Sequence, residues 1–193
     1  MHYSKDSDKK PFMSRTISSS IETENLIIRD AVEKDIPALK SICCSWTDKQ
    51  LLEGEWFEES YIEKCISEGD LPPIANASRA LYQLKAICSK KDSCIVGFLD
   101  VYHGFPNPST VWISIFVVNA QVQQHGVGRE AVAAIAAAAK EKGYASLGIG
   151  VHLKNWKGLR FWTRNGFDRI TDIRGDKDYG SNSFSVIYLE KPL

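Results

Sequence analysis

The segment that decides the fold of this chain is Gln123-Gln124-His125-Gly126-Val127-Gly128-Arg129. An apolar run typical of a strand precedes it, and an alanine-rich run typical of a helix follows it. Because glycine has no Cβ, glycines at a strand-to-helix turn let a ligand come close to the backbone. The N–H groups that begin a helix favour a phosphate. The segment lacks the spacing of a P-loop and of G-x-G-x-x-G, so alone it indicates a phosphate-binding turn or the close packing of a turn.

A second segment lies downstream, at Asn155-Trp156-Lys157-Gly158-Leu159-Arg160-Phe161-Trp162-Thr163-Arg164-Asn165-Gly166-Phe167. Together the two segments resemble the GNAT superfamily of N-acetyltransferases, with its acetyl-CoA pyrophosphate loop Q-x-x-G-x-G and its segment N-x-x-A-x-x-[LF]-Y-x-x-x-G-F. Gly158 stands where alanine is usual, and Trp162 stands where tyrosine is usual. A weaker similarity begins at Ile28-Arg29-Asp30-Ala31, so the resemblance runs from about residue 25 to the end.

The order of elements predicted from the sequence matches this resemblance. Strands are predicted over residues 26–28, 80–88, 94–102, 110–118, 146–153 and 183–189, and helices from residue 35 onward and over 56–66, 125–142 and 156–164. The resemblance implies an α/β fold of the α+β type, with a mixed, mostly antiparallel central sheet, helices on both faces and a splay between the two central parallel strands. We predict a polar arm over residues 1–24 and a single domain over 25–193.

Composition excludes several classes of protein. The 193 residues carry 24 basic and 24 acidic side chains, which argues against a dedicated nucleic-acid binder. No run of about 18 apolar residues indicates a membrane span, and the start lacks the apolar core of a signal peptide. The five cysteines are scattered and the four histidines lie far apart, which favours reduced thiols and argues against a metal site. We therefore expect a cytoplasmic protein without a membrane or nucleic-acid partner, either a monomer or a homodimer.

The resemblance implies that acetyl-CoA is the acyl donor and that no metal takes part. An amine would attack the thioester directly in a ternary complex, and a backbone N–H near Val117 would polarise the thioester carbonyl. The residues implied in cofactor binding are Phe116, Val117, Val118, Gln123, Gln124, His125, Gly126, Val127, Gly128, Arg129, Asn155, Gly158, Phe161 and Trp162.

The general base and the general acid depart from the family pattern. Members of the family often carry Glu or His at the places of Trp112 and Ser114, and neither residue is a base near pH 7. The candidate catalytic residues are Asp100, His103 and Ser114, and His152 is a further substitute base that acts through a water chain. His103 also fits a hairpin residue at the surface, and Asp100 also fits a turn anchor. Trp162 cannot release a proton near neutral pH, so the thiolate leaves unassisted or water protonates it.

The acceptor is predicted from the acidic stretch between Trp46 and Asp70, where eight acids face two lysines. An acidic wall would favour a cationic small-molecule amine, whereas the alternative is a solvated helix face. The sequence therefore predicts an N-acetyltransferase that acts on a small primary amine. A catalytically silent acyl-CoA-binding regulatory module and an acetyltransferase of protein amines remain as alternatives.

Overall fold

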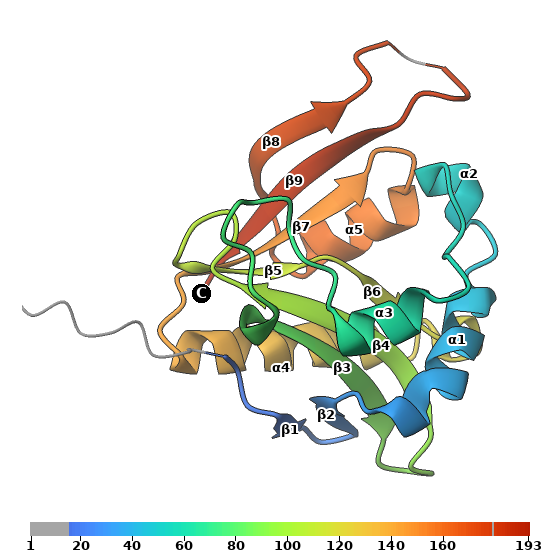
Figure 1. The fold of residues 1–193 in the computed structure, drawn as a ribbon, viewed down its shortest axis with the longest axis vertical. Coiled ribbons are helices and arrows are strands. Elements are labelled where there is room, and N and C mark those ends of the chain that lie inside the picture. The colour runs from blue at the N-terminus through green and yellow to red at the C-terminus, as the bar shows by residue number, and fades with distance from the viewer. Residues whose placement is uncertain (1–15, 179) are drawn as a thin grey trace, which may run out of the picture.

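The computed structural model describes residues 16–178 and 180–193 (Figure 1). The strands in this part of the chain are β1 (Ser20–Glu22), β2 (Leu26–Asp30), β3 (Tyr82–Ser89), β4 (Ile95–His103), β5 (Thr110–Ile113), β6 (Phe116–Val118), β7 (Ser146–His152), β8 (Arg169–Gly175) and β9 (Ser185–Pro192). The α-helices are α1 (Ile36–Ser45), α2 (Lys49–Glu53), α3 (Tyr61–Ser67), α4 (Val127–Glu141) and α5 (Trp156–Arg164). None of these described helices is long and apolar enough to cross a membrane.

All of the described strands join one sheet in the order β1-β2-β3-β4-β5-β7-β9-β8, and β6 pairs with β4 beside this path. Helices α4 and α5 pack on one face, and α1 and α3 pack on the other (Figure 1). The alternation along β7 separates the two faces, because Leu147, Ile149 and Val151 join the core under α4 and α5. Gly148 and Gly150 therefore face the opposite side, where a Cβ on either would meet the ring of Trp112.

The sheet is splayed between its two parallel strands, as predicted. The parallel pairing of β5 with β7 runs from Thr110 beside Ser146 to Ile113 beside Ile149, and the other described pairings are antiparallel. Beyond Ile113 the chain leaves β7, and β6 pairs with β4 alone among the described strands. One edge of β6 is therefore open among the described strands. The single parallel pairing and the helices on both faces confirm the predicted mixed, mostly antiparallel sheet.

Asp100 on β4 holds the break between β5 and β6. Its side chain is fully buried, and Oδ1 accepts hydrogen bonds from the backbone N–H groups of Ser114 (2.9 Å) and Ile115 (3.0 Å). The backbone N–H of Asp100 donates to the carbonyl of Ile115 at 3.1 Å. The predicted continuous strand over 110–118 is therefore two strands, because these bonds fix an irregular pair of residues between them.

The structure adds elements that the sequence did not indicate. Ile17 is buried, and β1 pairs with β2, so the last part of the predicted arm packs on the domain, whereas residues 1–15 lie outside the described residues. The predicted helix over 56–66 begins only at Tyr61, and the short α2 precedes it. Strand β8 was missed because its side chains are almost all exposed, so it has no alternation of apolar and polar residues.

Candidate active site

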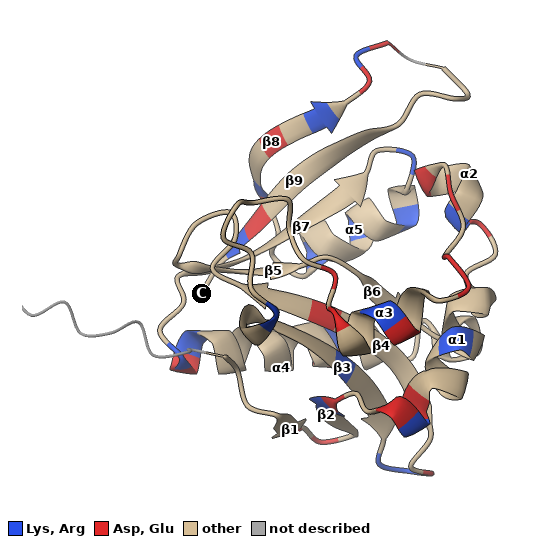
Figure 2. Ribbon diagram, in the orientation of Figure 1, with Lys and Arg blue, Asp and Glu red and all other residues tan. Residues whose placement is uncertain are grey.

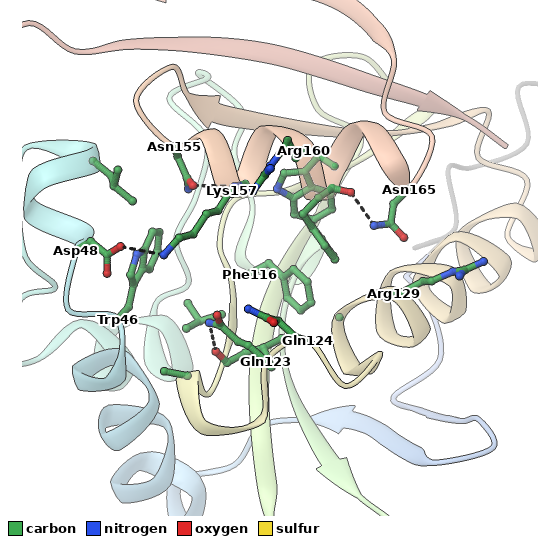
Figure 3. A pocket seen from close by; sticks show the side chains of 18 of the residues that line it. Trp46, Asp48, Phe116, Gln123, Gln124, Arg129, Asn155, Lys157, Arg160 and Asn165 are labelled. Atoms are coloured by element: carbon green, nitrogen blue, oxygen red, sulfur yellow. Dashed lines mark hydrogen bonds and ion pairs between the residues drawn. The ribbon is translucent and has the colours of Figure 1, made fainter.

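A groove with a volume of about 970 Å³ opens at the splay (Figure 3). It lies between β6, the turn that begins α4, helix α5 and the connection from α1 to α2. The predicted cofactor residues that line it are Phe116, Val117, Val118, Gln123, Gln124, Gly126, Gly128, Arg129, Asn155, Gly158, Phe161 and Trp162. The side chains of His125 and Val127 do not line it. His125 Nδ1 lies 2.8 Å from the carbonyl of Gln123, and Val127 packs against the core.

The turn before α4 has a left-handed backbone conformation at Gly126, as expected for a glycine at a strand-to-helix turn. Gly126 is the N-cap of α4 and has φ +88°, a conformation that side chains rarely adopt, and a Cβ there would point into open space. Gln124 also has a positive φ, of 67°. The Gln123 side chain donates from Nε2 to the carbonyl of Val118 at 2.9 Å, which ties the turn to the end of β6. The first N–H groups of α4 therefore begin beside the groove without an acceptor within the helix.

Gly128 serves packing as well as access. A Cβ at this position would lie 3.1 Å from the ring of Phe161, so the first turn of α4 sits closely against α5. The close packing of a turn therefore applies to Gly128, whereas phosphate binding at the turn of Gly126 stays a prediction. Gly126 is required by its backbone, and Gly128 is required by the approach of two helices.

Asn155 caps α5 and explains the glycine at position 158. Asn155 Oδ1 accepts a hydrogen bond from the N–H of Gly158 at 2.8 Å. A Cβ at residue 158 would lie 2.8 Å from the amide group of Asn155, so alanine there would displace the cap. The departure from the family pattern is therefore coupled to the position of Asn155.

Basic side chains gather along the groove, and sequence reasoning missed most of them. Arg129 was predicted, but Lys157, Arg160 and Arg164 of α5 also line the groove. Figure 2 shows blue bands along α5, and Figure 3 shows Lys157 and Arg160 on this helix. The signal was the spacing of three and four residues, which places the three side chains on one face of a helix. Together with Arg129, these side chains make this side of the groove basic.

Aromatic rings form the inner wall of the groove. Trp162 is 6% exposed, and its ring centroid lies 5.7 Å from that of Phe116, 5.0 Å from that of Phe161 and 4.9 Å from that of Phe167. This agrees with the interpretation of Trp162 as a packing residue at the pocket wall.

The connection from α1 to α2 forms the opposite wall. Trp46 and Asp48 line the groove, and Asp48 Oδ2 lies 3.7 Å from Lys157 Nζ (Figure 3). This ion pair joins the two walls across the groove. Asp48 therefore forms an ion pair with Lys157, a pairing that the sequence did not indicate.

Much of the acidic stretch is paired with lysines. Glu53, Glu58 and Glu63 form ion pairs with Lys49 (3.1 Å), Lys64 (2.5 Å) and Lys40 (2.6 Å), respectively. Glu55 and Glu59 are exposed and do not line the groove, and Figure 2 shows red segments between α2 and α3. The exposed pairs of Glu58 and Glu63 support the alternative of a solvated helix face, whereas the pair of Glu53 with Lys49 is largely buried.

His103 does not have the free nitrogen that a base requires. Its ring is 1% exposed, Nδ1 lies 2.8 Å from the carbonyl of Leu81, and Nε2 accepts a hydrogen bond from the N–H of Ile17 at 3.2 Å. Burial lowers its pKa to about 4, although the bond to Leu81 opposes this. Because backbone groups occupy both nitrogens, the structure corrects the expectation of a catalytic or surface role, and His103 ties β4 to two other segments.

Asp100 and Ser114 shape the splay and do not line the groove. Burial raises the pKa of Asp100 to about 7, the charge of Asp70 raises it as well, and the N–H groups of Ile115 and Ser114 oppose the shift. Ser114 is exposed, and its hydroxyl is no base near neutral pH. Asp100 therefore fixes the position of β6, and the catalytic role expected of Asp100 and Ser114 stays a prediction.

His152 ends β7 on the face of the sheet opposite α5. Its Nδ1 atom is buried and has no hydrogen-bond partner in the described part of the chain. Burial lowers its pKa, and Lys49 lowers it too, whereas Glu53 and Glu55 oppose the shift. His152 is therefore a neutral histidine with an unused ring nitrogen.

The described residues meet neither the requirements of a metal site nor those of a disulfide bond. Within residues 16–178 and 180–193, no group of three or more His, Cys, Asp or Glu side chains is placed to hold a metal ion. All five cysteines lie in the described part of the chain and are free, with Cys44 and Cys94 exposed and the other three buried.

Comparisons with known proteins agree with this geometry. The family model described as Acetyltransferase (GNAT) family matches residues 47–167. This span is more than half of the chain and contains the turn before α4 and helix α5. The fold and the match define an acyltransferase, and the chain belongs to the GNAT family of acetyltransferases, which use acetyl-CoA. No curated protein matches the chain significantly.

Solved structures share the fold at low sequence identity. A probable acetyltransferase of the GNAT family from Chromobacterium violaceum ATCC 12472 is 14% identical with a TM-score of 0.71, covering 100% of this chain and 96% of its own. A GNAT family acetyltransferase from Bacillus anthracis is 18% identical with a TM-score of 0.68, covering 90% of this chain and 98% of its own. Another, from Elizabethkingia anophelis with acetyl-CoA bound, is 19% identical with a TM-score of 0.58, covering 89% and 100%.

Proposed function

We propose that this protein transfers an acetyl group from acetyl-CoA to the primary amine of a small molecule, by direct attack in a ternary complex. The observation that carries the proposal is the open edge of β6, which lies in the same groove as the left-handed turn at Gly126. An extended pantetheine arm fits a strand edge, and a pyrophosphate fits the start of a helix. The acetyl-CoA in the Elizabethkingia anophelis structure supports this choice of donor.

The donor would lie along the groove with its charged end at α4. The pyrophosphate would meet the N–H groups of Val127, Gly128 and Arg129, and the basic face of α5 would balance the phosphate charge. The pantetheine would follow Phe116, Val117 and Val118, with Asn155 on the far side. A backbone N–H near Val117 would stabilise the oxyanion that forms at the thioester carbonyl.

The acetyl transfer would proceed without an acid from Trp162. The amine attacks the thioester carbon, a carbon–nitrogen bond forms, and the electron pair of the broken carbon–sulfur bond leaves with the CoA thiolate. An indole N–H donates hydrogen bonds but does not release its proton near neutral pH. The thiolate therefore leaves as the anion or takes its proton from water.

The acceptor would approach from the face that carries Trp112 and Tyr188, which it shares with α1 and α3, since α4 and α5 cover β7 on the other face. The hairpin of β8 and β9 closes against α2 on this side, because a Cβ at Gly54 would lie 3.1 Å from the ring of Phe184. A closed approach of this kind favours a small amine over a folded protein. This packing is the reason for choosing a small-molecule acceptor.

The test is thiol release from acetyl-CoA with a panel of small amines and lysine or amino-terminal peptides, and mass spectrometry of the products. We expect release that depends on a small amine, together with its acetylated product. Release only with peptides would replace the small acceptor with a protein amine. Calorimetric binding of acetyl-CoA without any acetylated product would favour the silent regulatory module, and absence of binding would overturn the proposal.

A further inference from the structure

His152 ends β7 just outside the residues that line the groove, and its Nδ1 atom makes no hydrogen bond within the described part of the chain. It lies three residues beyond Ile149, the last residue of β7 that pairs with β5, and so at the mouth of the splay. By alternation its side chain faces the same side as Gly148 and Gly150. This is the side of Trp112, from which the acceptor would approach in the proposed function.

We propose that His152 is the general base that accepts a proton from the acceptor amine, directly or through one water. The inference rests on the proposed function and assigns the proton acceptor that this function requires. A neutral imidazole has one N–H and one lone pair, so it can take a proton without losing its N–H.

The first support is the unsatisfied ring nitrogen. Buried polar atoms in proteins are nearly always hydrogen-bonded, and an exception calls for an explanation. Nδ1 of His152 is buried and has no partner among the described residues. His103 shows the contrast, because backbone groups at Ile17 and Leu81 satisfy both of its nitrogens. Of the histidines considered as bases, His152 is the one with a ring nitrogen that no described group hydrogen-bonds.

The second support is the set of neighbours around the ring. From α2, Lys49 and Glu53 form a largely buried ion pair, with side chains 6% and 17% exposed. Lys49 also donates to the carbonyl of Glu55 at 3.3 Å, which fixes the ammonium group. On the adjoining strand, β9, the residue opposite His152 is the neutral Val186.

These neighbours suit a base that changes charge during a reaction. Burial and the charge of Lys49 lower the pKa of His152, so its neutral form prevails at pH 7. The carboxylates of Glu53 and Glu55 act in the other direction, so they stabilise the imidazolium once it forms. The ammonium of Lys154, two residues along the chain, lies 3.9 Å from the ring centroid of Phe184 and donates to the carbonyl of Ser181, so other partners hold it.

The proton balance of the step is simple. As the amine nitrogen bonds to the acetyl carbon, one N–H proton passes to the free ring nitrogen of His152. The electron pair of the carbon–sulfur bond leaves with the thiolate, and the imidazolium later releases its proton to water. The products are a neutral amide, CoA thiolate and a regenerated base.

The experiment measures kcat and kcat/KM against pH, with the best amine of the panel, in three proteins. These are the unaltered protein, the variant His152→Gln and the control variant Leu153→Ala. We expect His152→Gln to lower kcat by about 100-fold or more, and to remove the fall in rate at acidic pH. Acetyl-CoA affinity by calorimetry should change by less than about twofold. Leu153 is the next residue, 39% exposed, and Leu153→Ala should retain the wild-type pH profile. Added imidazole should restore part of the rate of His152→Ala but not of His152→Gln.

The outcomes separate the inference from the proposed function. Wild-type turnover together with an unchanged rate and pH profile in His152→Gln would overturn the role of His152 and leave the proposed function intact. A wild-type protein that binds acetyl-CoA but acetylates no amine would end both. A slow variant whose acidic limb persists, without imidazole rescue, would reduce His152 to a packing residue.

Discussion

The carboxylate of Asp100 accepts the backbone N–H of Ser114 at 2.9 Å, and this bond lies at the point where the chain leaves β7. A second N–H, that of Ile115, is bonded to the same oxygen atom. A buried carboxylate with two such bonds fixes an irregular stretch of backbone that a regular ladder would not hold. The open edge of β6 therefore depends on a side chain of β4, outside the groove.

Replacement of Asp100 tests this dependence. Asp100→Asn retains an oxygen acceptor, whereas Asp100→Ala leaves two partly buried N–H groups unbonded, at a cost of about 2 kcal/mol or more. We expect Asp100→Ala to weaken acetyl-CoA binding as well as stability, because β6 loses its anchor. Urea unfolding and calorimetry measure the two effects. An Asp100→Ala protein with wild-type stability and affinity would show that the splay does not need this carboxylate.

Asp100 also gives the stability a pH dependence of known sign. Its pKa is raised from 3.8 to about 7, mainly by burial, so its contribution to folding is fully present below pH 3.8 and is lost as the pH rises through about 7. The loss amounts to up to about 4 kcal/mol. We expect Asp100→Asn to remove this decline, which falls between about pH 4 and pH 7. The same decline in both proteins, followed by urea unfolding, would assign it to other groups.

His103 predicts a pH dependence of the opposite sign. Its pKa is lowered from 6.5 to about 4, mainly by burial, so the stability that its neutral form supplies is present above pH 6.5 and is lost as the pH falls to about 4. The loss is about 3 kcal/mol. His103→Ala should be less stable at pH 7.5, because Ile17 and Leu81 lose their partner, and its stability should fall less between pH 6.5 and pH 4. An unchanged slope would contradict this.

The basic face of α5 predicts the position of the phosphates. Arg160→Glu places a negative charge in the groove and should weaken acetyl-CoA binding by about tenfold or more, or about 1.4 kcal/mol. Binding of S-acetylpantetheine, which lacks the nucleotide and its phosphates, should change little. Lys142→Glu, beyond the far end of α4 and exposed, is the matched control and should retain affinity. Equal losses for both ligands would place the phosphates elsewhere.

Sequence predicted the elements whose ends are set by local chemistry. Helix α5 has the bounds that were predicted, because Asn155 caps one end and Gly166, with φ +86°, follows the other. The turn at Gly126 was predicted for the same reason, since a left-handed conformation favours glycine. Strand β8 was missed because no local pattern marks an exposed edge strand.

Sequence could not separate the histidines, because their roles depend on distant segments. His103 is satisfied by Ile17, 86 residues away, and no spacing in the chain indicates that bond. The charge around His152 comes from Lys49 and Glu53, whose own pairing cancels part of the acidic stretch. Counting acids along the chain therefore predicted a wall that the three-dimensional pairing reduces.

The last prediction concerns Trp162 and the leaving thiolate. Because the indole packs against three phenylalanine rings and is 6% exposed, Trp162→Phe should lower stability by about 1 to 3 kcal/mol. Since the indole supplies no proton, the rate per folded molecule should change by less than tenfold, or about 1.4 kcal/mol of barrier. Trp162→Tyr adds a hydroxyl that can protonate the thiolate, so its rate should equal or exceed that of Trp162→Phe. Stopped-flow thiol release, corrected for the folded fraction by circular dichroism, measures these rates. A thousandfold loss in a folded Trp162→Phe would mean that the indole takes part in the reaction, because loss of wall packing alone leaves the donor edge of β6 and the turn at Gly126 in place.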